Sequence, residues 1–484
     1  MTESTNSRWP ENIGRIHLIA VCGTGMGALA CMLKESGYEV TGSDQNVYPP
    51  MSRFLQEKGI DVTRGFSGDN LALRPDLVVV GNAVSKTNPE VEAMMELGLA
   101  YCSMPQALNH LVAAGKKPIV ITGTHGKTTT AALIAHLLVQ AGLDPTFMIG
   151  GILKNFDSNY RLGKGEYFVV EGDEYDTAFF DKGPKFLHYR PHAAVLTSVE
   201  FDHADIFADL DHVKAAFRQF VAGLPPTCRL VAFDGDHSVQ DLIRNSPCRV
   251  ESYGQQPGSH WRMDNIEVQP PRTTFEVFKT NGPFKRFRSP LMGDHNLRNT
   301  LAAIAVADCL NIPADGIEAA LASFAGIRRR QEIRGVRNGI TVMDDFAHHP
   351  TAVRETIRAV RPFFRPGRVV AVFEPRTNSS MRDVFQETYA QSFDAADLVC
   401  IRRPPLLEKI PPEQRFSSEK LVADLTDRGK KAHFFPDTDT IIGFLRAEAR
   451  SGDLILVMSN GGFDNIHERL LEQLQAPAPV QRRV

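Results

Sequence analysis

The chain alternates short apolar runs with glycine-rich turns and longer segments of helical periodicity, most clearly over its first half. The run IHLIAVC at residues 16–22 precedes a glycine turn and then MGALACMLKESG, where apolar side chains recur at helical spacing. Uninterrupted apolar runs are typical of parallel strands that are buried on both faces. Similar strands are predicted at residues 77–81, 118–123, 167–171, 193–199, 368–374 and 453–459. The pattern therefore predicts an α/β fold with parallel sheets.

Two breaks divide these elements into three parts. AGKK at residues 114–117 precedes a new strand, and GIRRRQEIRG at residues 326–335 interrupts the pattern before GITVMDD. A chain of 484 residues is also too long for one ordinary core. We therefore predict three domains, and we expect antiparallel strands within residues 250–290, where apolar and polar positions alternate. The predicted boundaries are 1–114, 115–326 and 327–484.

Composition narrows the possible classes of function. Hydrophobic residues make up 43% of the chain and charged residues 23%, which are ordinary globular values. A net charge of -3 provides no basic field, so a nucleic-acid partner is not expected. The seven cysteines form no CxxC pair, and the polar beginning of the chain has no apolar signal region. We expect a cytoplasmic protein that is not inserted in a membrane.

The segment PIVITGTHGKTTT, at residues 118–130, is the strongest local motif. It places a glycine-rich turn between a strand and a helix, where backbone N–H groups can bind phosphate, Lys127 can reach a terminal phosphate and Thr128 can bind magnesium. Ile121 replaces the first glycine of the full P-loop pattern, and a tight turn with a solvated lysine is the simpler alternative. The threonines and helix start after the lysine favour a phosphate site. Its candidate residues are Gly123, Thr124, His125, Gly126, Lys127, Thr128 and Thr129.

Acidic residues and a histidine follow two of the predicted parallel strands. The carboxyl ends of such strands are where open α/β sheets bind ligands, and magnesium beside a triphosphate needs only one or two protein ligands. Solvated acidic loops would explain each group alone, whereas together with the phosphate loop they indicate a metal-nucleotide site. The residues are Glu171, Asp173, Glu174 and Asp176, then Glu200, Asp202, His203 and Asp205.

An N-terminal glycine turn offers a second phosphate-binding motif. Gly23, Thr24, Gly25 and Ala28 match the dinucleotide fingerprint, and Asp44 follows the next strand at the expected spacing. The turn is suited to a pyrophosphate, which NAD and a UDP-sugar both contain. Alone it does not choose between a dehydrogenase and an enzyme that uses a UDP-sugar.

Three further groups have simpler structural explanations. Helix capping and turn formation account for polar residues at helix starts, and adjacent histidines cannot both face one ligand. An arginine run is more often a solvated face than a phosphate clamp. The groups are His295, Asn296 and Asn299; Asp344, Asp345, His348 and His349; and Arg328, Arg329 and Arg330.

Taken together, these motifs resemble the Mur ligases. GTHGKTTT, EGDEYD, FDHAD, GDHNLRN, the pair Arg329-Arg330 and DDFAHHP stand in the order and spacing of that family over nearly the whole chain. The resemblance implies a Rossmann-like N-terminal domain that binds a UDP-sugar, a central P-loop ATPase-like domain that binds ATP, and a C-terminal Rossmann-like domain that binds a peptide. A folate-type ligase shares the last two domains but should lack the N-terminal glycine turn.

The resemblance also implies roles for matching positions. Lys127, Glu171 and His203 would be catalytic, with Thr128, Glu171 and His203 as magnesium ligands. ATP would contact the phosphate loop, with His295, Asn296 and Asn299 near the adenine and Arg329, Arg330 and Asp345 completing the site. Substrates would contact Gly23, Thr24, Gly25, Asp44, His348 and Arg376. One departure is Phe217, which stands where several members carry a carbamylated lysine, with Lys214 one helical turn away.

Several segments are closer to the murein peptide branch of this family than to its L-alanine-adding branch. They are SDQNVYPPMS, GDEYDTAFFDK, FDHADIF, EPRTNSS and MSNGGF. The resemblance therefore implies that ATP and magnesium drive the joining of L-alanyl-γ-D-glutamyl-meso-diaminopimelate to UDP-N-acetylmuramate through an acyl phosphate, in peptidoglycan recycling. Addition of L-alanine to UDP-N-acetylmuramate is the alternative, and an NAD-dependent dehydrogenase is a remote one.

Overall fold

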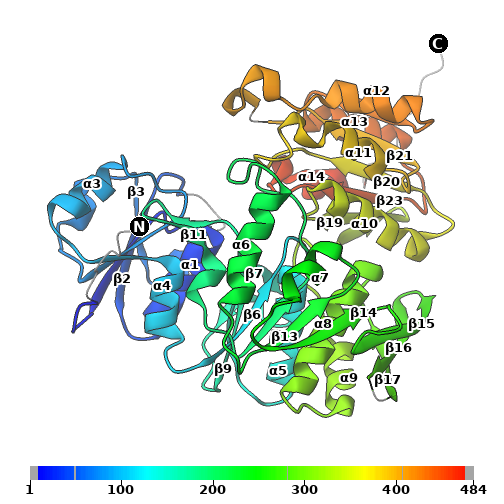
Figure 1. Cartoon of the computed structure of the whole chain (residues 1–484). Coiled ribbons are helices and arrows are strands. Elements are labelled where there is room, and N and C mark those ends of the chain that lie inside the picture. The colour runs from blue at the N-terminus through cyan, green and yellow to red at the C-terminus, as the bar shows by residue number, and fades with distance from the viewer. Residues whose placement is uncertain (1–8, 48–50, 281, 406, 475–484) are drawn as a thin grey trace. The chain divides into compact units, whose positions relative to one another are not determined.

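The computed structural model describes residues 9–47, 51–280, 282–405 and 407–474 (Figure 1). These residues divide into two compact units. One contains the chain up to Val199 together with Asp211–Trp261 and Ala302–Ala320. The other contains Glu200–Leu210, Arg262–Leu301 and the chain from Leu321 onward. The three-domain division at 1–114, 115–326 and 327–484 stays a prediction.

The first unit begins with a parallel sheet in the order β3-β2-β1-β4-β5. This order matches the start of a dinucleotide-binding fold, and the glycine turn follows β1 at its carboxyl end. The strands are β1 Arg15–Ile19, β2 Glu39–Asp44, β3 Asp61–Arg64, β4 Leu77–Val80 and β5 Tyr101–Ser103. The helices are α1 Thr24–Glu35, α2 Met51–Glu57, α3 Pro89–Glu96 and α4 Met104–Ala107.

Seven further strands of this unit pair in the order β14-β13-β12-β6-β9-β7-β8. All neighbours are parallel except β7 and β8, so the carboxyl ends of β6, β9 and β12 share one edge. The strands are β6 Lys117–Thr122, β7 Thr146–Leu153, β8 Ser158–Arg161, β9 Tyr167–Gly172, β12 Ala193–Leu196, β13 Arg229–Phe233 and β14 Arg249–Gly254. A small antiparallel pair consists of β10 Asp176–Ala178 and β11 Asp181–Pro184.

The helices that follow in the sequence are α5 Lys127–Gln140, α6 Leu210–Ala222, α7 His237–Ile243, α8 Asp294–Cys309 and α9 Ala314–Ser323. Helix α5 is buried along most of its length, which is why its sequence shows a weak polar face. Between α7 and α8 lie β15 Trp261–Gln269, β16 Arg272–Lys279 and β17 Gly282–Ser289. The antiparallel pairing of β16 with β17 confirms the expectation for residues 250–290.

The second unit contains a sheet in the order β18-β19-β23-β20-β21-β22. Alternate residues of β20 enter different cores: Ala371 packs with α10, α11 and α12, whereas Val372 packs with α13 and α14. The strands are β18 Glu332–Arg337, β19 Ile340–Asp345, β20 Val369–Phe373, β21 Leu398–Arg402, β22 Ala432–Phe435 and β23 Leu454–Met458. The helices are α10 Pro350–Val360, α11 Gln386–Ser392, α12 Ser418–Asp427, α13 Thr438–Glu448 and α14 Ile466–Gln473.

The strands predicted from apolar runs are all present, but two end clearly earlier than expected, one of them being β1, which ends at Ile19 within the run at 16–22. The strand expected at 193–199 ends at Leu196: the Thr197 nitrogen still donates to the Thr122 carbonyl of β6, but the Thr197 hydroxyl and Ser198 bond to the turn that follows β6. Within the described ranges, no helix is both long and apolar enough to cross a membrane.

Candidate active site

The turn after β6 requires glycine at its first position. Gly123 has φ 126°, and a Cβ there would lie 2.1 Å from Thr197 Oγ1 and 2.8 Å from the backbone nitrogen of Ser198. Gly126 has φ 84° and is the N-cap of α5, which begins at Lys127. The turn therefore exposes backbone N–H groups at the positive end of a helix, as an anion site requires.

The end of β12 holds this turn in place. The backbone nitrogen of Thr124 donates to the Ser198 carbonyl (2.8 Å), and that of His125 donates to Ser198 Oγ (3.1 Å). Thr197 Oγ1 in turn donates to the His125 carbonyl (2.5 Å). Residues 197–198 thus brace the turn, which explains why β12 stops at Leu196.

Lys127 lies in a buried cluster of charges. Its ammonium donates to the Gly123 carbonyl (2.7 Å) and to Glu174 Oε2 (2.8 Å). Burial alone would lower the pKa of Lys127, but Glu174, Asp173 and Glu171 outweigh that effect and raise it above its ordinary value. The lysine is therefore a cation at neutral pH.

Glu171 and Thr128 form a pair of oxygen donors beside the turn. Thr128 Oγ1 donates to Glu171 Oε2 (3.0 Å), and the Gly150 nitrogen donates to Glu171 Oε1 (2.6 Å). Burial and the nearby Asp173 raise the pKa of Glu171, against the opposing effect of the Gly150 N–H and Lys127. Magnesium prefers octahedral oxygen ligands at about 2.1 Å, which places adjacent ligands roughly 3 Å apart. The two side chains therefore fit a magnesium site.

Lys185 is part of this cluster, although no sequence motif pointed to it. Its ammonium donates to Asp173 Oδ2 (3.1 Å) and lies 4.1 Å from the centre of the Tyr175 ring. Burial raises the pKa of Asp173, but Lys185 and Lys127 outweigh that effect and lower it below the usual value. The only signal was a lysine in the irregular segment DKGPKF, which looks like an ordinary surface lysine.

Phe217, which stands where the resemblance implies a carbamylated lysine, packs in the interior of its unit. The side chain is fully buried in α6, and its ring centre lies 5.4 Å from that of Phe186. Lys214, one turn away, is 4.0 Å from Asp211 on the same helix. Position 217 therefore belongs to the apolar core.

The N-terminal turn is shaped by Asp44. One carboxylate oxygen accepts from the Cys22 nitrogen (2.9 Å) and the other from the Asn46 nitrogen (2.8 Å). Gly23 is the N-cap of α1, which starts at Thr24. Asp44 therefore links the loop after β1 to the loop after β2 through its two carboxylate oxygens. The contacts of Gly23, Thr24, Gly25 and Asp44 with a UDP-sugar stay a prediction.

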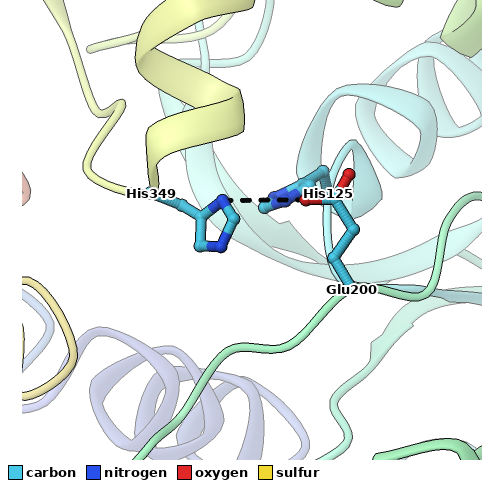
Figure 2. Close-up of side chains that lie close together, drawn as sticks. All are labelled: His125, Glu200 and His349. Atoms are coloured by element: carbon cyan, nitrogen blue, oxygen red, sulfur yellow. Dashed lines mark ion pairs between the residues drawn. The ribbon is translucent and has the colours of Figure 1, made fainter. Parts of the chain in front are cut away.

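In the second unit, the segment after Val199 packs on the start of α10. Figure 2 shows Glu200 and His349, with 3.8 Å between Glu200 Oε2 and His349 Nδ1. His349 is the N-cap of α10: its Nδ1 accepts from the Thr351 nitrogen (3.2 Å), so Nε2 carries the proton and donates to the Phe201 carbonyl (3.1 Å). The Glu200 pair becomes ionic only when His349 takes a second proton.

Three histidines surround Asp202, which is 8% exposed. Burial would raise the pKa of Asp202, but His203, His348 and His349 outweigh that effect and lower it. His203 adopts φ 53°, a left-handed conformation that few non-glycine residues hold. His348 Nδ1 lies 3.1 Å from the Phe346 carbonyl, and so the adjacent histidines 348 and 349 have different partners.

The linker arginines and Asp345 are also held by neighbours. Arg329 donates to the carbonyls of Ser459 (2.6 Å) and Gly461 (2.7 Å), and Arg330 lies over the Phe346 ring. Asp345 accepts from two backbone N–H groups, at Gln331 and Ala347 (2.8 Å each). Burial raises the pKa of Asp345, and Arg330 opposes that rise.

Helix α8 begins at Asp294, which confirms the predicted helix start. Asn296 donates to the Met292 carbonyl (2.9 Å), and Asn299 Nδ2 lies 3.3 Å from Asn296 Oδ1. These bonds order the first turn of the helix. Adenine contacts by His295, Asn296 and Asn299 stay a prediction, as do the nucleotide roles of Arg329, Arg330 and Asp345.

Arg376 lies at one end of a chain of alternating charges at the carboxyl edge of the C-terminal sheet. Its guanidinium is 3.7 Å from Glu374 Oε2, and Glu374 is fully buried. Arg402 bonds to the same Glu374 oxygen and also donates to Asp464 Oδ2 (2.7 Å). The inner pair is buried, whereas the Arg376 and Asp464 side chains are 33% and 51% exposed. The chain therefore presents one cationic and one anionic group to solvent.

Comparisons with known proteins agree with this geometry. Models of three Mur ligase parts match: the family's catalytic domain at residues 15–116, the middle domain at 121–307 and the glutamate ligase domain at 328–461. A UDP-N-acetylmuramate–L-alanyl-γ-D-glutamyl-meso-2,6-diaminoheptandioate ligase of Escherichia coli K12 is 40% identical, over 96% of this chain and 99% of that protein. A UDP-N-acetylmuramate–L-alanine ligase of Syntrophomonas wolfei is 35% identical, over 95% and 97%.

A solved structure extends the likeness to three dimensions. The crystal structure of a murein peptide ligase from Psychrobacter arcticus 273-4 aligns with a TM-score of 0.72 at 34% identity, and the match covers 97% of this chain and all of that one. Sequence motifs, sheet order and the phosphate loop thus agree with the same assignment, including the predicted α/β fold class. The chain belongs to the Mur ligase family.

Proposed function

We propose that this chain joins L-alanyl-γ-D-glutamyl-meso-diaminopimelate to UDP-N-acetylmuramate, with ATP as the energy source and magnesium as the cofactor. The observation that carries the proposal is the buried Lys127, placed at the start of α5 beside the donor pair Thr128 and Glu171. The 40% identity to the ligase from E. coli supports the tripeptide as the substrate. We further propose a cytoplasmic role in peptidoglycan recycling, through which the protein would affect cell shape, the cell cycle and division.

The chemistry follows from the reactivity of the groups. A carboxylate is a poor acyl donor, so transfer of the γ-phosphoryl group from ATP to the lactyl carboxylate creates a good leaving group. The peptide amine then attacks the acyl phosphate, an amide forms and phosphate leaves. Magnesium, when bound, neutralises charge on the phosphoryl oxygens. Thr128 and Glu171 would hold it, and His203 is proposed as a further ligand.

This chain's residues would stabilise charge rather than form bonds to the substrates. The N–H groups of the first turn of α5 would bind the phosphates, and Lys127 would neutralise charge that develops on the γ-phosphoryl group. To do so, its ammonium must exchange Glu174 for a phosphate oxygen, since the two are 2.8 Å apart. The Asp44 turn would hold the UDP-sugar, and Arg376 and His348 would face the peptide.

Addition of L-alanine is the second candidate, because the S. wolfei relative is 35% identical over nearly the same length. The dehydrogenase interpretation of the N-terminal turn explains neither the phosphate loop nor the family match.

We expect ATP-dependent phosphate release to require both UDP-N-acetylmuramate and the tripeptide. The assay offers free L-alanine, tripeptide or tetrapeptide to the purified protein. Consumption of L-alanine alone would replace the tripeptide proposal with the second candidate.

Arg376 provides a test of the peptide site. We expect Arg376→Ala to raise KM for the tripeptide by about ten- to a hundred-fold, because a charge-assisted hydrogen bond to a carboxylate contributes roughly 1.5–3 kcal/mol. KM for ATP should stay within about two-fold, since the nucleotide contacts lie elsewhere. Arg428→Ala is the matched control, because Arg428 pairs with Asp394 on the exposed surface. Equal tripeptide KM values in the two variants would remove Arg376 from the peptide site.

A further inference from the structure

The segment of residues 200–205 carries His203 and is anchored to C-terminal elements of its unit. Thr351 Oγ1 donates to Glu200 Oε2 (2.7 Å), beside the Glu200 and His349 pair of Figure 2. The Phe201 ring lies 6.1 Å from that of Phe385, in an edge-to-face arrangement. Although the segment lies between two strands of the central sheet in sequence, it contacts residues between His349 and Phe385 of its own unit.

Two further anchors come from the loop that follows β20. The backbone nitrogen of Ala204 donates to Ser379 Oγ (3.2 Å), and Asn378 Nδ2 donates to Asp205 Oδ2 (2.8 Å). Ser379 is 4% exposed, whereas Asn378 and Asp205 are exposed. These bonds flank His203 on its carboxyl side, so they fix the direction in which the chain leaves that residue.

The same loop also carries Arg376, and it is internally rigid. The backbone nitrogens of Arg376 and Thr377 both donate to Ser380 Oγ (2.9 and 2.8 Å), and the Met381 nitrogen donates to the Thr377 carbonyl (3.0 Å). A short loop closed by such bonds moves as one piece. Arg376, at its start, and the anchors of the His203 segment are therefore mechanically linked.

We propose that Asn378 and Ser379 are positioning residues, which transmit occupancy of the peptide site at Arg376 to the segment that carries His203. The inference rests on the proposed function, which places the peptide at Arg376. When the peptide carboxylate immobilises Arg376, the loop is held in one position as a unit, and its bonds to Ala204 and Asp205 hold the His203 segment in turn. His203 would thus contact the acyl phosphate only when the attacking amine is also present. Less of the acyl phosphate would then be hydrolysed by water before the amide forms.

Backbone hydrogen exchange of the full-length protein tests the linkage directly. With UDP-N-acetylmuramate, magnesium and a non-hydrolysable ATP analogue present, we expect the tripeptide to slow exchange at residues 200–207 by roughly five-fold, the size that one or two hydrogen bonds produce. The double variant Asn378→Ala/Ser379→Ala should lose this slowing. Equal slowing in that variant and in the unmodified protein would overturn the proposal.

A variant in which the residues at 205 and 378 are exchanged distinguishes a positioning role from a general loss of structure. In Asp205→Asn/Asn378→Asp the amide and carboxylate exchange places, so the hydrogen bond can re-form, and we expect the tripeptide-dependent slowing to return. Ser379→Thr keeps the hydroxyl and is expected to retain it too. In the alanine double variant kcat should fall roughly five-fold while KM for ATP stays unchanged.

The failure of the linkage and that of the proposed function give different results. If the unmodified protein makes no amide from the tripeptide, the proposed function is wrong. If it makes the amide and the swapped pair fails to restore the slowing, only the linkage is wrong. Asn378 and Asp205 are exposed, so these variants are expected to fold.

Discussion

Replacing Lys127 with alanine is expected to lower the rate of amide formation by about three orders of magnitude, the usual cost of losing a preorganised charge at a transferring phosphoryl group. The ammonium is buried, held by the Gly123 carbonyl and Glu174, and kept protonated by the surrounding carboxylates. Phosphate release in the presence of UDP-N-acetylmuramate and tripeptide is the measurement. An unchanged rate would contradict the ligase mechanism.

Lys117→Ala is the matched control for this substitution. Lys117 begins β6, and its ammonium pairs with the exposed Glu166 (2.6 Å) at the end of that strand opposite to the turn that carries Lys127. We expect its activity to stay within about two-fold, because exposed ion pairs contribute little. The double variant Lys127→Ala/Glu174→Ala removes both charges of the buried pair. It should regain thermal stability relative to Lys127→Ala and still lack activity, which separates loss of chemistry from loss of fold.

Replacing Gly123 with alanine is expected to destabilise the first unit by about 3 kcal/mol or more and to abolish the rise in melting temperature that an ATP analogue produces. The φ of 126° is unfavourable for alanine, and the new Cβ would meet Thr197 Oγ1 and the Ser198 backbone. The turn therefore has to open, which moves the N–H groups that are proposed to bind phosphate. Urea unfolding and thermal melting with and without the analogue measure both effects.

Gly142→Ala is the control for backbone strain alone. Gly142 follows α5 with φ 74°, and no atom lies within 4 Å of a Cβ built there. We expect it to cost about 1 kcal/mol, the ordinary penalty of a left-handed residue, and to leave nucleotide binding intact. Similar unfolding midpoints for the two variants, with nucleotide stabilisation retained in both, would show that the close approach to residues 197–198 does not matter.

Much of the fold was predictable because burial on both faces leaves a simple trace in the sequence. The predicted runs at 77–81, 118–123 and 368–374 correspond to β4, β6 and β20, whose interiors are fully apolar. The turn after β6 was predictable for a related reason, since Gly123 and Gly126 have positive φ, which favours glycine. The carboxyl-edge rule placed Glu171 beside the turn after β6, because β6 and β9 are parallel neighbours that point the same way.

Side-chain contacts between residues that are distant in sequence could not be predicted in this way. Lys185 reaches Asp173 from an irregular segment, and no spacing distinguishes it from a surface lysine. The strand predicted at 193–199 was too long because Val199 makes the apolar run look continuous, whereas the hydroxyls of Thr197 and Ser198 bond to the turn after β6. The grouping of residues 200–205 with C-terminal elements likewise depends on contacts formed across distant parts of the chain.

The carboxylate of Glu174 competes with any incoming anion for the ammonium of Lys127. Because Lys127 already has a well-placed anionic partner, any competing anion must offer more than one negative oxygen to displace it. Chloride has no oxygen and gains little from such an exchange, whereas a triphosphate has several negative oxygens and would also engage the N–H groups of the turn and the metal ligands. The lysine can thus be permanently charged within a buried site and still discriminate among the many anions of a cell.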